Sequence, residues 1–213
     1  MSRLTGDEKH DHSATSTLDV LEVLYDRVLH HDPARPDHPG RDRFYLSKGH
    51  GPMAYYAVLA SHGYFPTEWL DGFASFDSPL GHHPDRTLVP GVEISSGSLG
   101  HGLPLGLGTA LGLRMQGNNA RTVVLVGDAE LDEGSNAEAI EFAAAAGLGG
   151  LTAVVIDNHS SSYAVRGRIA ERFRVNGWHA TTVSGRDHDQ LEAALSHRVP
   201  ETPTVVITRV EAV

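Results

Sequence analysis

The sequence predicts an α/β fold: a three-layer, open parallel sheet with helices on both faces. Two apolar runs, Thr122 to Val126 and Leu151 to Ile156, have the length and β-branched content of buried strands. Between them lies Ala137 to Gly147, an alanine-rich stretch with the composition of a helix. A strand, a helix and a second strand in this order predict a crossover between two parallel strands.

The remaining elements follow in chain order. Apolar residues recur at helical spacing from Leu18 to Val28, and Asp32 to Arg41 contains three prolines, which predicts a loop. Further helices are predicted over residues 51–62, 66–76, 100–116 and 187–197, and a last strand over residues 204–208. Residues 1–13 are charged and poor in apolar groups, so we expect a mobile segment there and a single domain over residues 14–213.

Composition excludes several classes of protein. A chain of 213 residues can bury a full core, and the absence of cysteine excludes disulfides and thiolate chemistry. The formal net charge of -10 argues against a general nucleic-acid-binding surface. No apolar stretch is long enough to span a membrane and the N-terminus has no signal-peptide core, so we expect a cytoplasmic protein that does not bind membranes.

Two polar side chains follow the two predicted strands of the crossover. Asp128 comes two positions after the first run, behind Gly127, and Asn158 comes two positions after the second, behind Asp157. Parallel strands end at one edge of a sheet, where open α/β sheets bind ligands. Oxygen donors suit Mg²⁺ carrying a phosphate, and a helix beginning near Ser135 would offer N–H groups to an anion. A lone Asp or Asn after a strand is more often a turn residue, but the pairing favours a ligand site.

Six motifs in register resemble the N-terminal, diphosphate-binding part of transketolases. The resemblance runs from about Leu18 to Ile207, and the segment around Asp128 is similar to the thiamine diphosphate fingerprint. The motifs are Asp42 to Gly51, His83 to Arg86 with Pro90 to Glu93, Ser96 to Gly102, Gly127 to Gly134, Asp157-Asn158, and Gly177 to His179 with Gly185 to Asp189. Each motif alone is a weak signal, but six in the family's order are specific.

The resemblance implies two cofactors, thiamine diphosphate and Mg²⁺. By similarity, the Asp128 side chain, the Asn158 side chain and the Ser160 backbone carbonyl would hold the metal ion. The residues that would contact the cofactor are Gly97, Ser98, Leu99, Gly127, Asp128, Ala129, Glu130, Asn158 and Ser160. Glycines suit such a pocket because the backbone must approach the ligand closely.

The resemblance also implies a set of catalytic residues. His50 and His83 match two histidines of the family's active site, and His10 matches a third when the chain is counted back from Asp19. Histidines suit proton transfer because their ordinary pKa lies near neutrality. Glu133 matches an acidic residue that meets its counterpart across the subunit interface.

These matches imply the N-terminal subunit of a split, heteromeric transketolase-like enzyme. A separately encoded pyrimidine-binding subunit would complete it in an α₂β₂ assembly. Together they would transfer a two-carbon ketol unit from a ketose, free or phosphorylated, to an aldehyde, and the chain alone would be inactive. One alternative is a split thiamine-diphosphate-dependent decarboxylase or acyloin-forming ligase that acts on a 2-oxoacid.

A second alternative is a non-catalytic cofactor-binding remnant or scaffold. Only Ala129 favours it, because this alanine replaces the second glycine of the fingerprint. Its methyl group is tolerable if the backbone φ there is negative and costly otherwise. Fourteen histidines also raise a zinc hypothesis, but no third or fourth ligand falls at a typical spacing from the histidine pairs, so we expect no zinc site.

Overall fold

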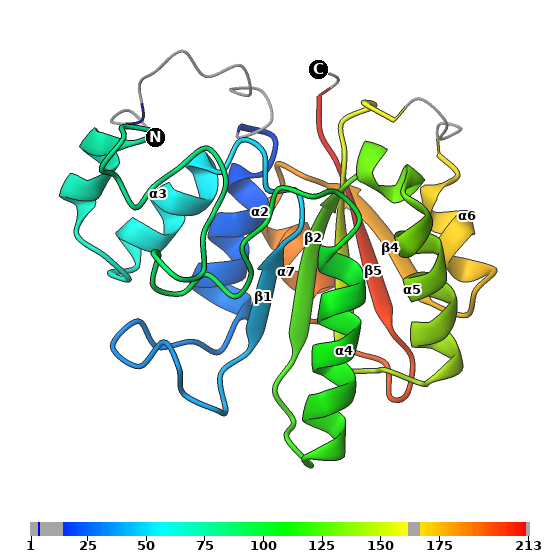
Figure 1. Cartoon of the computed structure of the whole chain (residues 1–213). Helices are drawn as coiled ribbons and strands as arrows, with labels where there is room; N and C mark the ends of the chain where they lie inside the picture. Colours follow the sequence, from blue (N-terminus) through cyan, green and yellow to red (C-terminus); the bar gives the residue numbers. More distant parts are fainter. Residues whose placement is uncertain (1–3, 5–14, 162–166, 212–213) are drawn as a thin grey trace.

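A single parallel sheet organises the part of the chain that the computed structural model describes, residues 4, 15–161 and 167–211 (Figure 1). Every neighbouring pair of strands is parallel. In spatial order the strands are β1 (Arg43–Leu46), β2 (Thr122–Gly127), β3 (Leu151–Asp157), β5 (Thr204–Arg209) and β4 (His179–Ser184). The predicted parallel sheet is confirmed, and so is the crossover from β2 to β3.

Helices cover both faces of this sheet (Figure 1). On one face lie α2 (Leu18–Val23), α3 (Met53–Ser61) and α7 (His188–Ser196), and on the other α4 (Gly102–Met115), α5 (Gly134–Ala145) and α6 (Ile169–Arg174). Successive residues of β2 point to opposite faces: Val123 and Leu125 pack in the first core, while Val124 and Val126 pack in the second. The predicted three-layer architecture is therefore confirmed.

Several local elements differ from the sequence prediction. The first helix continues as a π-helix, η1 (Leu24–Val28), and the helix predicted over residues 66–76 is a short 3₁₀-helix, η2 (Thr67–Gly72). That helix ends early because Phe73 takes a ψ of 132°, outside the helical range, and Ala74 after it takes a φ of 59°. The strand β1 and the helix α6 were not predicted, since four and six residues are too few for a periodic pattern.

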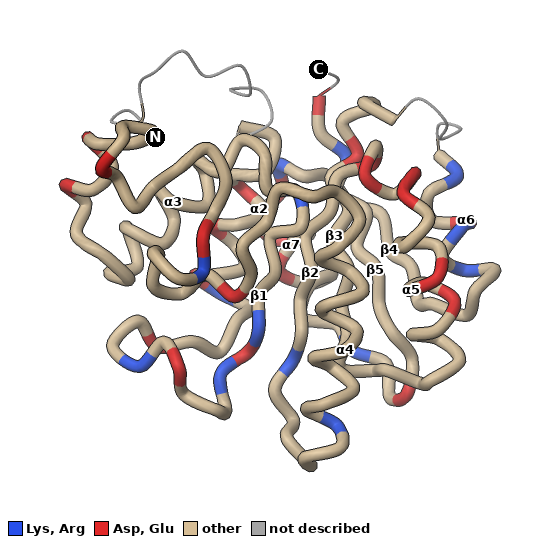
Figure 2. Tube along the Cα trace, in the orientation of Figure 1, with Lys and Arg blue, Asp and Glu red and all other residues tan. Residues whose placement is uncertain are grey.

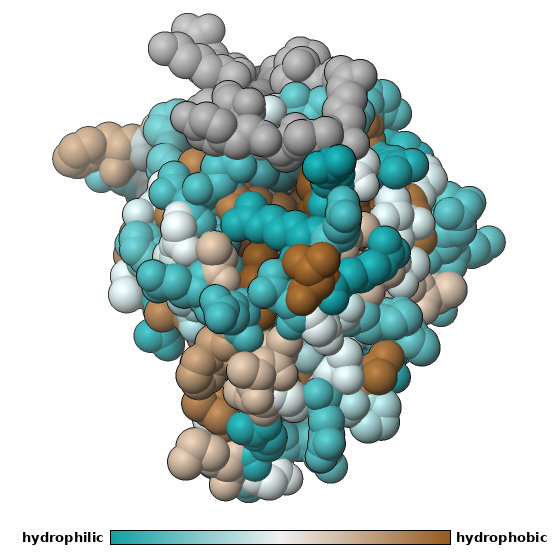
Figure 3. Space-filling view, turned by 90° about the vertical axis from the view of Figure 1, so that its right-hand side faces the viewer, coloured by the Kyte–Doolittle hydropathy of each residue, from teal (hydrophilic) through white to brown (hydrophobic). Residues whose placement is uncertain are grey.

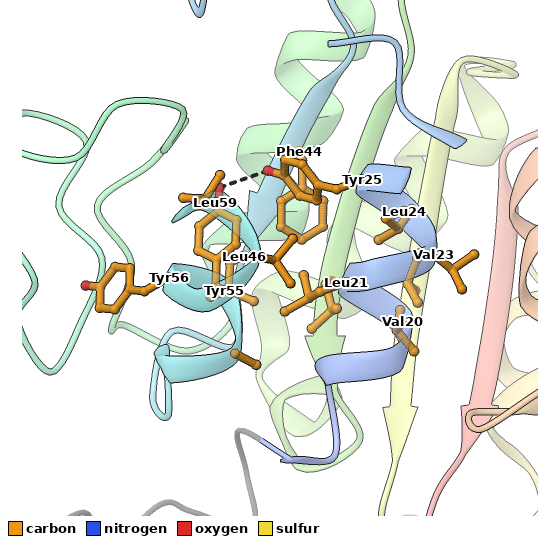
Figure 4. Packing of buried hydrophobic residues seen from close by; sticks show 14 of the residues in the cluster. Val20, Leu21, Val23, Leu24, Tyr25, Phe44, Leu46, Tyr55, Tyr56 and Leu59 are labelled. Carbon is orange, nitrogen blue, oxygen red and sulfur yellow. Dashed lines mark hydrogen bonds between the residues drawn. The ribbon is translucent and has the colours of Figure 1, made fainter. Parts of the chain in front are cut away.

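Helix α2 and η1 anchor β1 from one side (Figure 4). Leu21 and Leu24 are fully buried, and Phe44 and Leu46 of β1 belong to the same cluster. The Tyr25 hydroxyl donates a hydrogen bond of 3.3 Å to the Tyr55 hydroxyl of α3. This packing fixes the direction in which the chain leaves β1. Within the described ranges, no helix combines the length and apolar character that crossing a membrane requires.

Helix α4 lies close to β2 because Gly106 has no side chain. A Cβ atom there would lie 2.3 Å from Cγ2 of Val124, whereas a Cβ at Gly108, on the same helix, would meet nothing within 4 Å. We expect Gly106→Ala to lower the free energy of unfolding by about 1–3 kcal/mol through overpacking. The control Gly108→Ala should leave it unchanged or raise it by up to about 1 kcal/mol. Urea unfolding measures both, and equal effects would contradict this packing.

Candidate functional site at the carboxyl edge of the sheet

Strands β2 and β3 end side by side, and two buried polar residues follow them. Gly127 is paired with Ile156, and the Asp128 N–H donates a hydrogen bond of 3.0 Å to the Ile156 carbonyl. Asp128 is 2% exposed and Asn158 is 5% exposed. Both residues therefore lie inside the protein at the same edge of the sheet, as the strand–helix–strand pattern predicts.

The Asp128 carboxylate is the centre of the turn that follows β2. It accepts hydrogen bonds from the Ala129 N–H at 2.8 Å, the Ser160 N–H at 2.8 Å and the Ser160 hydroxyl at 2.5 Å. The Ser161 N–H donates a fourth hydrogen bond, of 3.3 Å, to the same carboxylate. A carboxylate has about four acceptor sites, so a cation bound here would displace one or more of these donors. The bonds to Ser160 bring the loop after β3 directly against the end of β2.

Asn158 carries an oxygen that lacks a partner. Its side-chain Oδ1 is buried and accepts no hydrogen bond. A buried polar atom left without a partner costs about 1–3 kcal/mol, so such an atom in a folded protein needs an explanation. A metal ion that accepts this oxygen would supply one. The backbone beside it is strained, because His159 takes a φ of 61°, and strain of this kind is common at ligand sites.

The donor set at this edge fits Mg²⁺. A carboxylate at Asp128, an amide oxygen at Asn158 and a backbone carbonyl at Ser160 are all hard oxygen ligands, which Mg²⁺ prefers. Over residues 4, 15–161 and 167–211, no group of three or more His, Cys, Asp or Glu side chains could hold a metal ion. A metal site here would therefore depend on the amide and carbonyl oxygens. The assignment of these three ligands stays a prediction.

Ala129 causes no backbone strain. It opens a short 3₁₀-helix, η3 (Ala129–Asp132), and it is not among the described non-glycine residues with positive φ. The condition for tolerating a methyl group at this position is therefore met. Ala129 therefore does not favour the alternative of a non-catalytic remnant.

Two loops meet above the strand ends through glycine contacts. A Cβ atom on Gly49, next to His50, would lie 2.4 Å from the Ser96 hydroxyl oxygen. A Cβ atom on Gly97 would lie 3.0 Å from Cδ2 of His83, and Gly97 takes a φ of 141°. Side chains cannot replace these glycines without moving the loops. The structure thus brings the segments of His50, His83 and Gly97 together, and Ser98 and Leu99 follow directly.

The turn that contains Glu133 packs against the loop that contains Gly100. Gly100 has a φ of 82°, and a Cβ atom there would lie 2.6 Å from Cβ of Glu133. The Ser135 hydroxyl donates a hydrogen bond of 2.8 Å to the Gly100 carbonyl. Glu133 itself is exposed, so a partner chain can reach it. Its predicted role at a subunit interface stays a prediction, and His10 lies outside the described residues.

Glu130 holds three of these segments together. Its buried carboxylate accepts hydrogen bonds from the Ser47 hydroxyl, from the Gly100 N–H at 2.9 Å and from the Gly127 N–H at 3.2 Å. Burial raises the pKa of Glu130, and these hydrogen bonds oppose the rise. The predicted contact of Glu130 with a cofactor stays a prediction. Its role as a clamp between loops was missed, because no local pattern marks it.

Lys48 is a second charged residue that sequence reasoning missed. It follows β1, is 5% exposed, and has a pKa that burial lowers to about 8 while Glu130 and Asp128 oppose the fall. Figure 2 shows residues of both charges at this end of the sheet. A signal was present in the sequence: one of the chain's two lysines stands just before Gly49-His50, in a motif that resembles the family.

The sequence matches a protein family over almost its whole length. The model of the family described as "Transketolase, thiamine diphosphate binding domain" matches residues 5–211. Among curated relatives, an apulose-4-phosphate transketolase subunit of Actinobacillus succinogenes is 44% identical over 135 residues, which are 63% of this chain and 49% of that protein. A 6-deoxy-6-sulfo-D-fructose transketolase subunit of Clostridium sp. is 34% identical, over 93% of this chain and 75% of that protein.

A further relative carries a different kind of name. The protein "Ferredoxin fas2" of Rhodococcoides fascians is 51% identical over 211 residues, which are 99% of this chain and 69% of that protein. Ferredoxin clusters are held by cysteine thiolates. Since this chain has no cysteine, its 213 residues offer no ligands for such a cluster.

Solved structures show the same fold. A transketolase from Pichia stipitis in complex with sedoheptulose 7-phosphate is 28% identical with a TM-score of 0.79, over 93% of this chain and 36% of that chain. The transketolase from Leishmania mexicana is 26% identical with a TM-score of 0.79, over 96% and 37%. The chain thus spans little more than a third of these enzymes. By the match over residues 5–211, it belongs to the family of transketolase thiamine diphosphate binding domains.

Proposed function

We propose that this chain is the diphosphate-binding subunit of a split transketolase. With a separate subunit that binds the pyrimidine half of the cofactor, it transfers a two-carbon ketol unit from a ketose or ketose phosphate to an aldehyde. Relatives that are themselves named as transketolase subunits support the division into two chains. The observation that carries the proposal is the pair of buried residues Asp128 and Asn158 at one edge of the sheet, where the Asn158 amide oxygen lacks a partner and Ser160 contacts Asp128.

The residues of this edge have distinct roles in the proposal. Asp128, Asn158 and the Ser160 carbonyl hold Mg²⁺, and the backbone at Gly97 to Leu99 leaves room for the rings of thiamine diphosphate. When bound, the cofactor supplies the carbanion chemistry, while the protein supplies orientation and electrostatics. His50 and His83, which lie on the loops above the strand ends, move protons to and from the substrate hydroxyls.

The outer surface of α4 and α5 is the surface we assign to the partner. Leu105 and Met115 on α4 and Phe142 on α5 are 51%, 80% and 53% exposed. Large apolar side chains exposed on two adjacent helices favour a role in binding another protein. The side of the molecule that carries α5 and α6 shows hydrophilic residues with hydrophobic ones among them (Figure 3). An α₂β₂ assembly would cover the apolar surface.

A substrate panel tests the proposed reaction. The chain would be co-purified with its partner and supplied with thiamine diphosphate, Mg²⁺, ketose donors, aldehyde acceptors and 2-oxoacids. Ketol transfer is the expected result. Turnover of 2-oxoacids alone would make the protein a decarboxylase or acyloin-forming ligase, and a formed complex that is silent with every donor would point to a scaffold.

The proposed role of His83 predicts a loss of turnover without a loss of binding. We expect His83→Asn to lower kcat about 100-fold or more, because a positioned acid–base group contributes that much. Thiamine diphosphate affinity should stay within about twofold of wild type, since His83 packs against Gly97 rather than holding the metal. The matched control is His82→Asn, whose ring lies 5.9 Å from Phe73. Equal losses in both variants would contradict the assignment.

A further inference from the structure

Lys48 lies where the carboxyl ends of β1 and β2 meet. Its backbone N–H donates a hydrogen bond of 3.3 Å to the Leu125 carbonyl of β2, so the residue is held against that strand. Its side chain passes over Gly127: a Cβ atom on that glycine would lie 3.4 Å from Cδ and 3.6 Å from Cε of Lys48. The ammonium-bearing end of the side chain is therefore directed to the strand end from which Asp128 departs.

Two buried carboxylates near Lys48 favour a positive charge at its position. Glu130 and Asp128 are buried carboxylates, and both act on Lys48 through space. A bound diphosphate would add further negative charge beside them. Buried charges are tolerated only when they are paired and hydrogen-bonded. The carboxylate of Glu130 already accepts three hydrogen bonds from the loops, which fix its position near Lys48.

We propose that Lys48 is a further cofactor-binding residue, whose ammonium group contacts the diphosphate of thiamine diphosphate while Glu130 serves as its counter-charge. The proposal rests on the proposed function, because it needs the diphosphate at this edge. Lys48 then neutralises the side of the diphosphate that the metal ion does not. Such a charge-assisted hydrogen bond forms only in the presence of the phosphate groups, so it selects the diphosphate over thiamine.

A purely structural role for Lys48 makes a different prediction. If Lys48 only balanced Glu130 within the folded chain, removal of either charge would loosen the cradle formed by Ser47, Gly100 and Gly127. Both substitutions would then weaken every ligand of the site alike. A contact with the diphosphate predicts different results for the two substitutions. Only loss of Lys48 then removes the preference for thiamine diphosphate over thiamine.

The test compares Lys48→Met, Lys48→Arg and Glu130→Gln in the complex with the partner. Dissociation constants for thiamine diphosphate with Mg²⁺ and for thiamine would be measured by calorimetry or competition, with thermal unfolding as a check of folding. We expect Lys48→Met to reduce the preference for thiamine diphosphate over thiamine about 10- to 100-fold. Lys48→Arg should retain most of this preference because it keeps the charge, and Glu130→Gln should also retain it.

Two results would overturn the inference. One is an unchanged preference in Lys48→Met, and the other is an equal loss in Lys48→Met and Glu130→Gln, which would mean that Lys48 acts only through the cradle. Failure of the proposed function would give a different binding result. In that case the wild-type complex itself would not bind thiamine diphosphate in a manner that depends on Mg²⁺.

Discussion

Asp128→Ala is expected to abolish Mg²⁺-dependent binding of thiamine diphosphate and, with it, all activity of the complex. Asp128 is the one charged group among the three proposed metal ligands, and its carboxylate also holds the loop after β3 through Ser160. Loss of residues that merely support a metal ligand costs about 10- to 100-fold in affinity. We therefore expect loss of the ligand itself to cost more than about 100-fold. Calorimetric titration of the complex with thiamine diphosphate, with and without Mg²⁺, measures this affinity.

Asp132→Asn is the matched control for this substitution. Asp132 belongs to the same turn and accepts a hydrogen bond of 2.8 Å from the Ser161 hydroxyl, but it is exposed. The control should bind cofactor and metal as wild type does, because a neutral amide can still accept that bond. If Asp128→Ala bound both as tightly as the control, the metal site would lie elsewhere.

The second large effect concerns the partner. We expect the purified 213-residue chain to have no ketol-transfer activity and the pyrimidine-binding subunit to restore it. The matched family region is the thiamine diphosphate binding domain alone, and two relatives of the chain are named as transketolase subunits. Cofactor chemistry depends on how protein groups orient and polarise the cofactor, and one half of the site supplies only part of these groups.

A titration measures this dependence. The chain is held at constant concentration, the partner is added, and ketol transfer is followed until it saturates at the stoichiometry of the complex. Substitution of an exposed apolar residue such as Met115 by Glu should raise the concentration of partner that half-saturation requires, because a charge would be buried in the interface. Turnover by the chain alone would contradict the proposed division of the site.

The sequence predicted the layers and the main edge of the site because the signals there are local. Two apolar runs flank an alanine-rich helix, and a polar residue, Asp128 or Asn158, stands two positions after the end of each run. Strand length and composition define β2 and β3, and parallel pairing then forces the two polar residues to one edge. The start of α7 is also local: the Asp187 side chain caps the helix by accepting a hydrogen bond from the Gln190 N–H.

Other features could not be predicted because they join distant parts of the chain. The clamp at Glu130 links it to Ser47, 83 residues away, and to Gly100, 30 residues away. Nothing near Glu130 in the sequence marks these partners, and an acidic residue in a turn is ordinarily solvated. The burial of Lys48 depends on the same convergence of loops. Residue types alone therefore indicate the proposed metal ligands, but not the groups that would hold and balance them.

The left-handed backbone conformation of His159 could also not be predicted from the sequence. Histidine takes a positive φ more often than most residues, but no pattern required it at this position. In the fold it turns the chain between Asn158 and Ser160, so that the Ser160 N–H reaches Asp128. Local strain of this kind persists only where the surrounding contacts impose it.

The most direct test of the account is a crystal structure of the two-subunit complex grown with thiamine diphosphate and Mn²⁺ in place of Mg²⁺. Anomalous scattering then locates the metal ion. We predict one peak bonded to the Asp128 carboxylate, the Asn158 Oδ1 atom and the Ser160 carbonyl, with the diphosphate beside it. A metal peak away from these atoms, or a cofactor bound at another edge of the sheet, would contradict the assignment of the site.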